Sequence, residues 1–324
     1  MRAFTYTRAR DVAGAVAGYG PGTMYLGGGT NLVDLMRLGV AAPEHLVDVS
    51  RLPLGEIAED EHGGVRIGAA VRNADLAAHP VIANRYPMLA QAVLAGASGQ
   101  VRNMATVGGN LLQRTRCTYF QDVTMPCNKR DPGSGCPAIN GDHANLAILG
   151  HSARCVATHP SDMAVALTAL DARVHVTSTS GARVIGMPGL HRLPADDPSR
   201  DTVLEPGELI TAVSLPPPLP GRSAYRKVRE RASFAFALVS VAAVLDTGPG
   251  GVIRGCRLAL GGVAHVPWRA FNTERAVAGV LGDRDSFAAA ADAELRAAAP
   301  LTRNVFKVAL ARNLIIATLE ELVS

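Results

Sequence analysis

Two glycine-rich segments carry residue types that could bind a phosphate group. The first spans residues 26–32 with the sequence LGGGTNL, and the second spans residues 105–110 with the sequence ATVGGN. Adjacent glycines let the backbone approach a ligand and turn its N–H groups toward phosphate oxygens, while Thr and Asn add uncharged donors. One such loop is weak support, because glycine-rich turns are common. Two loops favour a dinucleotide whose pyrophosphate is gripped from both sides.

The spacing of these glycines excludes two common nucleotide-binding folds. Neither segment has the Rossmann pattern G-x-G-x-x-G, and the chain has no P-loop G-K-[ST]. Each segment is expected to follow a strand and to end in small polar residues. A nucleotide-binding fold of another kind is therefore required.

Four of the five cysteines lie in one 39-residue stretch, separated by nine, eight and eighteen residues. The odd count and the dense cluster argue against a disulfide framework spread over the fold. No C-x-x-C pair occurs, so a zinc ribbon fits poorly. The spacing alone leaves free thiols, zinc and an iron–sulfur cluster open. The four residues are Cys117, Cys127, Cys136 and Cys155.

The stretch around these cysteines is rich in Pro, Gly, Asn and Asp and has little apolar periodicity. A loop of this length needs a function or a crosslink to order it, and four thiolates on an iron–sulfur cluster would supply the crosslink. Four basic side chains close in sequence would offset the negative charge of such a cluster. They are Arg114, Arg116, Lys129 and Arg130.

The elements that must position these segments are a mixture of helices and strands. Alternating or short apolar runs predict strands at 23–26, 46–50, 64–70, 173–178, 223–229, 239–246 and 252–263. Helical patterns cover 11–19, 74–78, 87–96, 162–172, 286–299 and 305–322, with Asp162 as an expected N-cap. The sequence PPPLP at 216–220 cannot continue a helix or a sheet ladder, so it predicts a boundary before a C-terminal α+β domain.

The composition narrows the class of protein further. The hydrophobic fraction of 48% and charged fraction of 19% are typical of a globular chain. The net charge of +4 is not gathered into a Lys/Arg run, so we expect no nucleic-acid partner. No apolar run approaches the ~20 residues that span a bilayer, so no membrane insertion is expected. The first residues contain no apolar h-region, so no signal peptide is expected.

Five segments, in order, resemble a known family: YLGGGTNLVDLMR, VRNMATVGGNLL, HPSDMAVALTALDA, LEPGELI and YRKVRERASFAFALV. They are similar to the FAD-binding subunits of the xanthine dehydrogenase and carbon monoxide dehydrogenase family, and most of all to flavin subunits of bacterial periplasmic molybdenum aldehyde oxidoreductases. The resemblance implies an α+β fold. A two-lobed FAD-binding domain of the vanillyl-alcohol-oxidase (PCMH) type would cover 1–218, with lobes at about 1–58 and 59–218. A smaller α+β domain of the CO dehydrogenase flavoprotein C-terminal type would cover 221–324.

The resemblance also implies which residues bind FAD. The first glycine segment would hold the pyrophosphate, Asp162 would be the acidic FAD contact, and Lys227 would lie near the isoalloxazine ring. Asn31 stands where many relatives have Asp, which removes an anion near the phosphates and should not weaken binding. The implied cofactor-binding residues are Met24, Tyr25, Leu26, Gly27, Gly28, Gly29, Thr30, Asn31, Leu32, Thr106, Gly108, Gly109, Asn110, Asp162, Ile210 and Lys227.

In the aldehyde oxidoreductase branch of this family, a cluster-bearing insert follows the second glycine segment. The resemblance therefore implies an insert at about 114–155 whose four cysteines bind a [4Fe-4S] cluster. Cys256 lies in an apolar strand and is expected to be an inert core residue.

The implied activity is electron transfer within a complex. A large partner subunit would bind molybdopterin and oxidise an aldehyde to a carboxylic acid, and a small partner would carry two [2Fe-2S] clusters. FAD would pass the electrons to an external acceptor, so no catalytic acid–base pair is expected. We expect a heterotrimer, exported to the periplasm with a signal-bearing partner; the alternative location is the cytoplasm. Three alternatives remain: a self-sufficient flavoenzyme, an Fe–S assembly or redox-sensing module, and a flavin subunit of a hydroxylase acting on a heterocycle or acyl-CoA.

Overall fold

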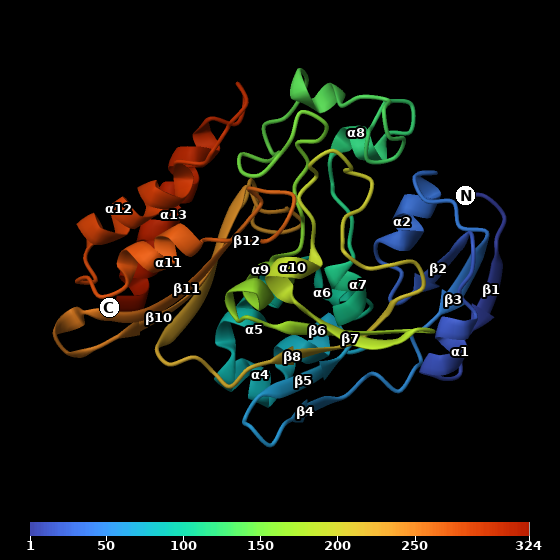
Figure 1. The fold of residues 1–324 in the computed structure, drawn as a ribbon, viewed down its shortest axis with the longest axis horizontal. Helices are drawn as coiled ribbons and strands as arrows, with labels where there is room; N and C mark the ends of the chain where they lie inside the picture. The colour runs from blue at the N-terminus through green and yellow to red at the C-terminus, as the bar shows by residue number, and fades with distance from the viewer. Residues whose placement is uncertain (324) are drawn as a thin grey trace.

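The computed structural model describes residues 1–323, which form three β-sheets with helices packed around them (Figure 1). The first sheet is parallel, in the order β1–β3–β2, and it lies at the N-terminal end of the molecule. The apolar side chains Ala15, Val16 and Val47 form its small core. The elements of this lobe are β1 (Thr5–Arg8), α1 (Val12–Ala17), β2 (Thr23–Leu26), α2 (Leu32–Arg37) and β3 (His45–Asp48).

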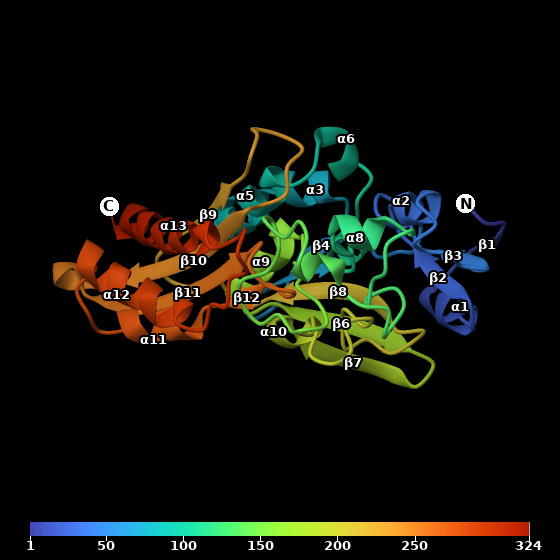
Figure 2. The ribbon, with the colours of Figure 1, turned by 90° about the horizontal axis from the view of Figure 1, so that it is seen from above.

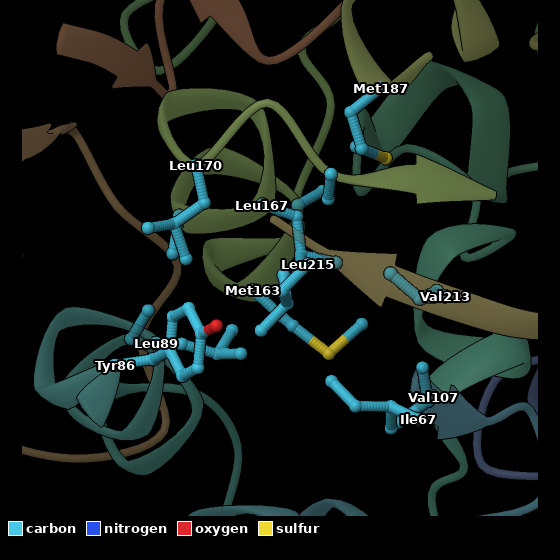
Figure 3. Packing of buried hydrophobic residues seen from close by; sticks show 14 of the residues in the cluster. Ile67, Tyr86, Leu89, Val107, Met163, Leu167, Leu170, Met187, Val213 and Leu215 are labelled. Carbon is cyan, nitrogen blue, oxygen red and sulfur yellow. The ribbon is translucent and has the colours of Figure 1, made fainter. Parts of the chain in front are cut away.

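The second sheet is antiparallel and has the order β4–β5–β8–β6–β7. Its core is built around α9: Met163 and Leu167 of this helix, and Leu170 directly after it, point toward side chains of β5, β8 and the α4–α5 region (Figure 3). The strands are β4 (Ile57–Glu59), β5 (Val65–Gly68), β6 (Arg173–Ser178), β7 (Gly181–Gly186) and β8 (Leu209–Leu215). The helices are α3 (Asn73–Ala78), α4 (Pro80–Arg85), α5 (Pro87–Ala95), α6 (Gly99–Arg102), α7 (Val107–Leu111), α8 (Thr118–Gln121), η1 (Pro137–Ile139), α9 (Asp162–Ala169) and α10 (Met187–Leu190).

The third sheet, β12–β11–β10–β9, is antiparallel and is covered on both faces (Figure 2). Successive side chains of β10 point to opposite faces of the sheet and belong to different hydrophobic cores. Val241 and Ala243 pack with the helices of the C-terminal region, while Ala242 and Val244 pack with α5 and α9. This sheet therefore joins the two halves of the chain. Its elements are β9 (Arg222–Val228), β10 (Val239–Thr247), η2 (Pro249–Gly251), β11 (Ile253–Gly261), β12 (Trp268–Arg269), α11 (Phe271–Val277), α12 (Arg284–Leu295) and α13 (Phe306–Val323).

The predicted α+β fold class is confirmed, and most predicted elements are present within a few residues of their expected bounds. Two local predictions are wrong. Ser161, not Asp162, caps α9, because the Ser161 hydroxyl accepts the N–H of Ala164 at 2.9 Å and Asp162 is the first helical residue. The second glycine segment does not follow a strand; it comes after α6, and its residues from Val107 onward form α7, with Thr106 as the N-cap.

No strand was predicted at β1, β4, β7, β8 or β12, which are short, polar or adjacent to glycine and proline. Within the described chain, no helix combines the length and apolar character needed to cross a bilayer.

The cysteine-bearing segment is held to the C-terminal helices by buried polar contacts. The Lys307 ammonium, in the first turn of α13, is fully buried and donates to the carbonyl oxygens of Leu146 at 2.8 Å and Gly262 at 2.5 Å. Asn304 donates to the carbonyl of Ala147 at 3.1 Å, and the backbone N–H of Arg303 donates to His143 at 2.9 Å. Burial lowers the pKa of Lys307 to about 7. These contacts make the start of α13 the anchor of residues 143–147.

Replacing Lys307 tests this anchor. Lys307→Met keeps a long apolar stem but leaves buried carbonyl oxygens without a donor, so we expect the free energy of unfolding to fall by about 2–4 kcal/mol. The control is Arg312→Met on the same helix, which removes an exposed ion pair with Asp292 and should cost less than ~1 kcal/mol. Urea denaturation of both variants measures the difference. Equal effects of the two substitutions would contradict the anchoring role.

Candidate functional site

The two glycine segments are in direct contact with each other. A Cβ atom placed on Gly28 would lie 1.9 Å from the carbonyl oxygen of Met104, so only glycine allows this approach of two backbones. Cβ atoms on Gly27 and on Gly109 would each lie 3.0 Å from the Thr106 hydroxyl oxygen, which accepts the backbone N–H of Gly109 at 3.2 Å. The paired arrangement expected from the sequence is present. Gly28, however, is required for the contact between the loops.

A large hollow of about 710 Å³ opens over these loops; we call it the loop hollow. Its walls come from the first glycine segment, from α7, and from the residues that lead into β8, including Ile210. Tyr25 closes one side, since its hydroxyl donates to the carbonyl of Gly207 at 2.8 Å. A hollow of this size and lining suits the phosphate and sugar parts of a dinucleotide.

A second hollow of about 280 Å³, here the inner hollow, continues from the first and shares Thr30, Asn31 and Gly109 with it. It reaches Asp162 and Lys227 and ends at Phe234 and Phe236. All the residues expected to bind FAD line one of the two hollows, apart from Leu26. Apart from Leu26 and the buried Val107, residues 24–32 and 106–110 therefore line the groove together with Asp162, Ile210 and Lys227.

The polar groups in the groove fit a bound dinucleotide. The side-chain oxygen of Asn31 accepts the backbone N–H of Arg114 at 2.9 Å, while its buried amide nitrogen has no partner among residues 1–323. An unpaired buried donor is costly unless a ligand satisfies it. The Gly109 backbone is exposed in the same place. An anionic oxygen is a ligand that the Asn31 amide donor favours.

Asp162 and Lys227 form a buried ion pair at 2.8 Å, which the sequence analysis did not foresee. Tyr225 donates to the same carboxylate at 2.5 Å, and Lys227 also donates to the carbonyl of Ala95 at 3.1 Å. Burial, followed by the neighbouring carboxylate, raises the pKa of Tyr225 well above its usual range. The pair joins α9 to β9 in the wall of the inner hollow, and its two charges largely cancel.

The four clustered cysteines line one small cavity with a volume of about 10 Å³. Contrary to expectation, the insert has an apolar core: Phe120, Ala138 and Val156 pack with Cys117 and Cys155. Burial raises the pKa of the Cys155 thiol to about 11 and also raises those of Cys117 and Cys136, so these thiols are poor nucleophiles. Among residues 1–323, no group of three or more His, Cys, Asp or Glu side chains has a geometry that could hold a metal ion.

Three of the four basic side chains near the cysteines already have partners. Lys129 and Arg114 both contact Asp201, at 2.5 and 2.6 Å. Burial alone would raise the pKa of Asp201, but these two cations hold it well below its usual range. Arg130 donates to backbone carbonyls, including that of Asp122 at 2.9 Å. Arg116 is different, because among residues 1–323 its side chain makes no hydrogen bond or ion pair, and its Nε is buried.

The remaining candidates have structural roles. His159 and His191 stack with ring centroids 4.2 Å apart, and burial lowers the pKa of both. His151 contacts the carbonyl of Ala299 at 2.6 Å. Cys256 is buried in β11, and burial raises its pKa to about 12, as expected for an inert core thiol.

This fold and groove are those of flavin subunits of molybdenum-containing oxidoreductases. Residues 2–218 match the family described as the FAD binding domain in molybdopterin dehydrogenase, and residues 223–322 match the CO dehydrogenase flavoprotein C-terminal domain. The chain belongs to this family of FAD-binding subunits.

The chain is 49% identical over 324 residues to the aldehyde oxidoreductase FAD-binding subunit PaoB of Escherichia coli K12, covering 99% of this chain and 98% of PaoB. It is 28% identical to the carbon monoxide dehydrogenase medium chain of Afipia carboxidovorans, covering 87% and 82% of the two chains. The solved structure of reconstituted CO dehydrogenase from Oligotropha carboxidovorans superposes with a TM-score of 0.78 at 25% identity, covering 99% of this chain and 98% of that chain.

The contact between the loops gives a testable consequence. Gly28→Ala places a Cβ against the backbone of Met104, so the loops must separate. We expect a loss of more than ~2 kcal/mol of stability together with weaker FAD binding. Gly99→Ala is the control, because a Cβ there meets nothing within 4 Å. Thermal unfolding and flavin content measure both effects. A Gly28→Ala protein as stable as the control would contradict this geometry.

Proposed function

We propose that the chain is the FAD- and [4Fe-4S]-binding electron-transfer subunit of a molybdenum-dependent aldehyde oxidoreductase. Its partners would be a molybdopterin-binding large subunit, which oxidises the aldehyde, and a small subunit with [2Fe-2S] clusters. The full-length similarity to an aldehyde oxidoreductase FAD-binding subunit is the main observation behind this choice. The proposal includes a heterotrimer that reaches the periplasm by co-export with a signal-bearing partner.

The groove supports an electron relay. Bound FAD accepts electrons singly and releases them singly or in pairs, which suits transfer between one-electron clusters and an external acceptor. The glycine loops and Asn31 would hold the dinucleotide, while the Asp162–Lys227 pair would shape the inner hollow. The Asp162 carboxylate of the inner hollow is already neutralised by Lys227. This favours the relay over a self-sufficient flavoenzyme, which would need a free base over the flavin.

The cysteine donor set supports the cluster. Four thiols around one cavity, beside the flavin groove, match the ligand number of a [4Fe-4S] site. Cluster binding requires deprotonated thiolates and a wider cavity than the present one, so the insert must expand around the cluster. A thiol-based redox sensor is disfavoured, because burial raises the pKa of Cys117, Cys136 and Cys155.

The cluster proposal predicts about four iron atoms and four sulfides per chain after anaerobic purification. Serine at Cys117, Cys127, Cys136 or Cys155 should lower the iron content. Cys256→Ser is the control and should leave it unchanged, because Cys256 lies in the core of the third sheet. Iron and acid-labile sulfide analysis, with electron paramagnetic resonance of the reduced protein, measures both. Zinc in place of iron, or full iron in Cys136→Ser, would refute the assignment.

The partner proposal predicts a stable complex. Co-expression with the neighbouring genes should yield one assembly containing this chain, a molybdopterin subunit and a [2Fe-2S] subunit, with aldehyde-dependent reduction of the flavin. Size-exclusion chromatography and flavin absorbance near 450 nm measure this. Elution of the chain as a monomer would count against the complex. Turnover of a heterocycle or an acyl-CoA instead of an aldehyde would identify a related hydroxylase.

A further inference from the structure

Arg116 is the one basic side chain of the inner hollow that lacks a protein acceptor. Its Nε is buried without a hydrogen-bond partner, and no ion pair joins it to a carboxylate between Met1 and Val323. The other two cations of this hollow are occupied: Lys227 is paired with Asp162, and Arg102 donates to the carbonyl of Gly96 at 2.8 Å. Asp34 attracts Arg116 from a distance without forming an ion pair.

The position of Arg116 is fixed by its neighbours. The ring of Phe236 lies 5.1 Å from the guanidinium carbon, a cation–π distance, and Cys117 follows directly in sequence. Arg116 also lines a third hollow of about 360 Å³, which reaches Cys117, His159 and Ser240. The guanidinium therefore stands in the wall between the flavin groove and the cysteine-bearing insert.

A half-buried cation without a counter-ion is unfavourable, because burial removes water from the charged group; accordingly, burial lowers the pKa of Arg116. Such an arrangement is stabilised when a ligand supplies negative charge. The phosphates have their own donors in the loop hollow, where Asn31 and the glycine N–H groups lie. The end of the groove at Arg116 has Phe234 and Phe236, whose flat apolar side chains suit a planar ring.

We propose that Arg116 is a positioning and potential-setting residue for the flavin ring, stabilising its reduced form. This inference rests on the proposed role of the chain as an FAD electron relay. Two-electron reduction adds negative charge to a flavin ring, and a fixed cation nearby favours the reduced over the oxidised ring. The guanidinium cannot be deprotonated near neutral pH, so its effect is a constant charge.

The test uses the assembled, FAD-loaded complex and measures the midpoint potential of the flavin by spectroscopic redox titration. In Arg116→Gln, the preference for reduced over oxidised flavin should fall at least tenfold, a decrease of about 30 mV for a two-electron couple. Arg116→Lys keeps the charge and should stay within threefold of wild type. Arg231→Gln is the matched control, because Arg231 is exposed and lines the third hollow but not the inner one.

The outcomes separate this inference from its rivals. An unchanged flavin potential with weaker FAD binding would assign Arg116 to the phosphates and overturn the proposal. A shift confined to the iron–sulfur signal would assign it to the cluster instead, and an equal shift in Arg231→Gln would reduce it to general surface charge. Iron and flavin contents of each variant show whether the complex is intact. Absence of FAD from the wild-type complex would contradict the proposed function itself.

Discussion

The groove depends on a backbone contact that leaves no room for a side chain. Gly28 approaches the carbonyl of Met104 so closely that a Cβ would overlap it, and Thr106 sits against both Gly27 and Gly109. The first segment follows β2 of the parallel N-terminal sheet, and the second forms the N-cap and the start of α7 in the larger lobe. The two lobes are therefore in contact through their backbone atoms at this point. The N–H groups of Gly108 and Gly109 are already bonded to the Ala69 carbonyl and the Thr106 hydroxyl, so free backbone donors for a ligand come from the first segment.

Most charged side chains near this contact are paired with one another, whereas a few polar groups at the groove have no protein partner. Asp201 pairs with Arg114 and Lys129, and Asp162 pairs with Lys227, so five charged groups near the groove hold elements of the fold together. Buried pairs of this kind contribute little net stability but are costly to break singly. Arg116 and the Asn31 amide nitrogen are left unsatisfied at the groove. An unpaired donor at a binding site indicates that the ligand supplies a hydrogen-bond acceptor or a negative charge there.

The sequence predicted the fold class and the glycine loops because both depend on local patterns. Alternation in residues 239–246 correctly gave β10, and adjacent glycines identified the loops. It could not predict the Asp162–Lys227 pair, since 65 residues separate the partners and only tertiary packing brings them together. The prediction of Asp162 as the N-cap of α9 is wrong, because Ser and Asp are both favourable N-caps and the sequence does not distinguish between them. In the structure Ser161 caps the helix, and Asp162 forms the ion pair with Lys227. Gly28 was assigned to ligand approach, whereas its neighbour is protein backbone.

The cysteine-bearing insert illustrates how a polar segment becomes ordered without a sheet of its own. Its small core uses Phe120 and the cysteines themselves, and its far end is gripped by Asn304 and Lys307 at the start of α13. Lys129, in the middle of the insert, is buried against Asp201 and His265. The insert is therefore held to the rest of the protein on two sides by contacts that do not involve a crosslink between the cysteines. The four cysteines line one small cavity, and the other residues around it come from loops, α8 and η1 and not from strands. Cys117 follows Arg116 directly in sequence, so one peptide bond joins a residue of the cysteine cavity to a residue that lines the inner hollow.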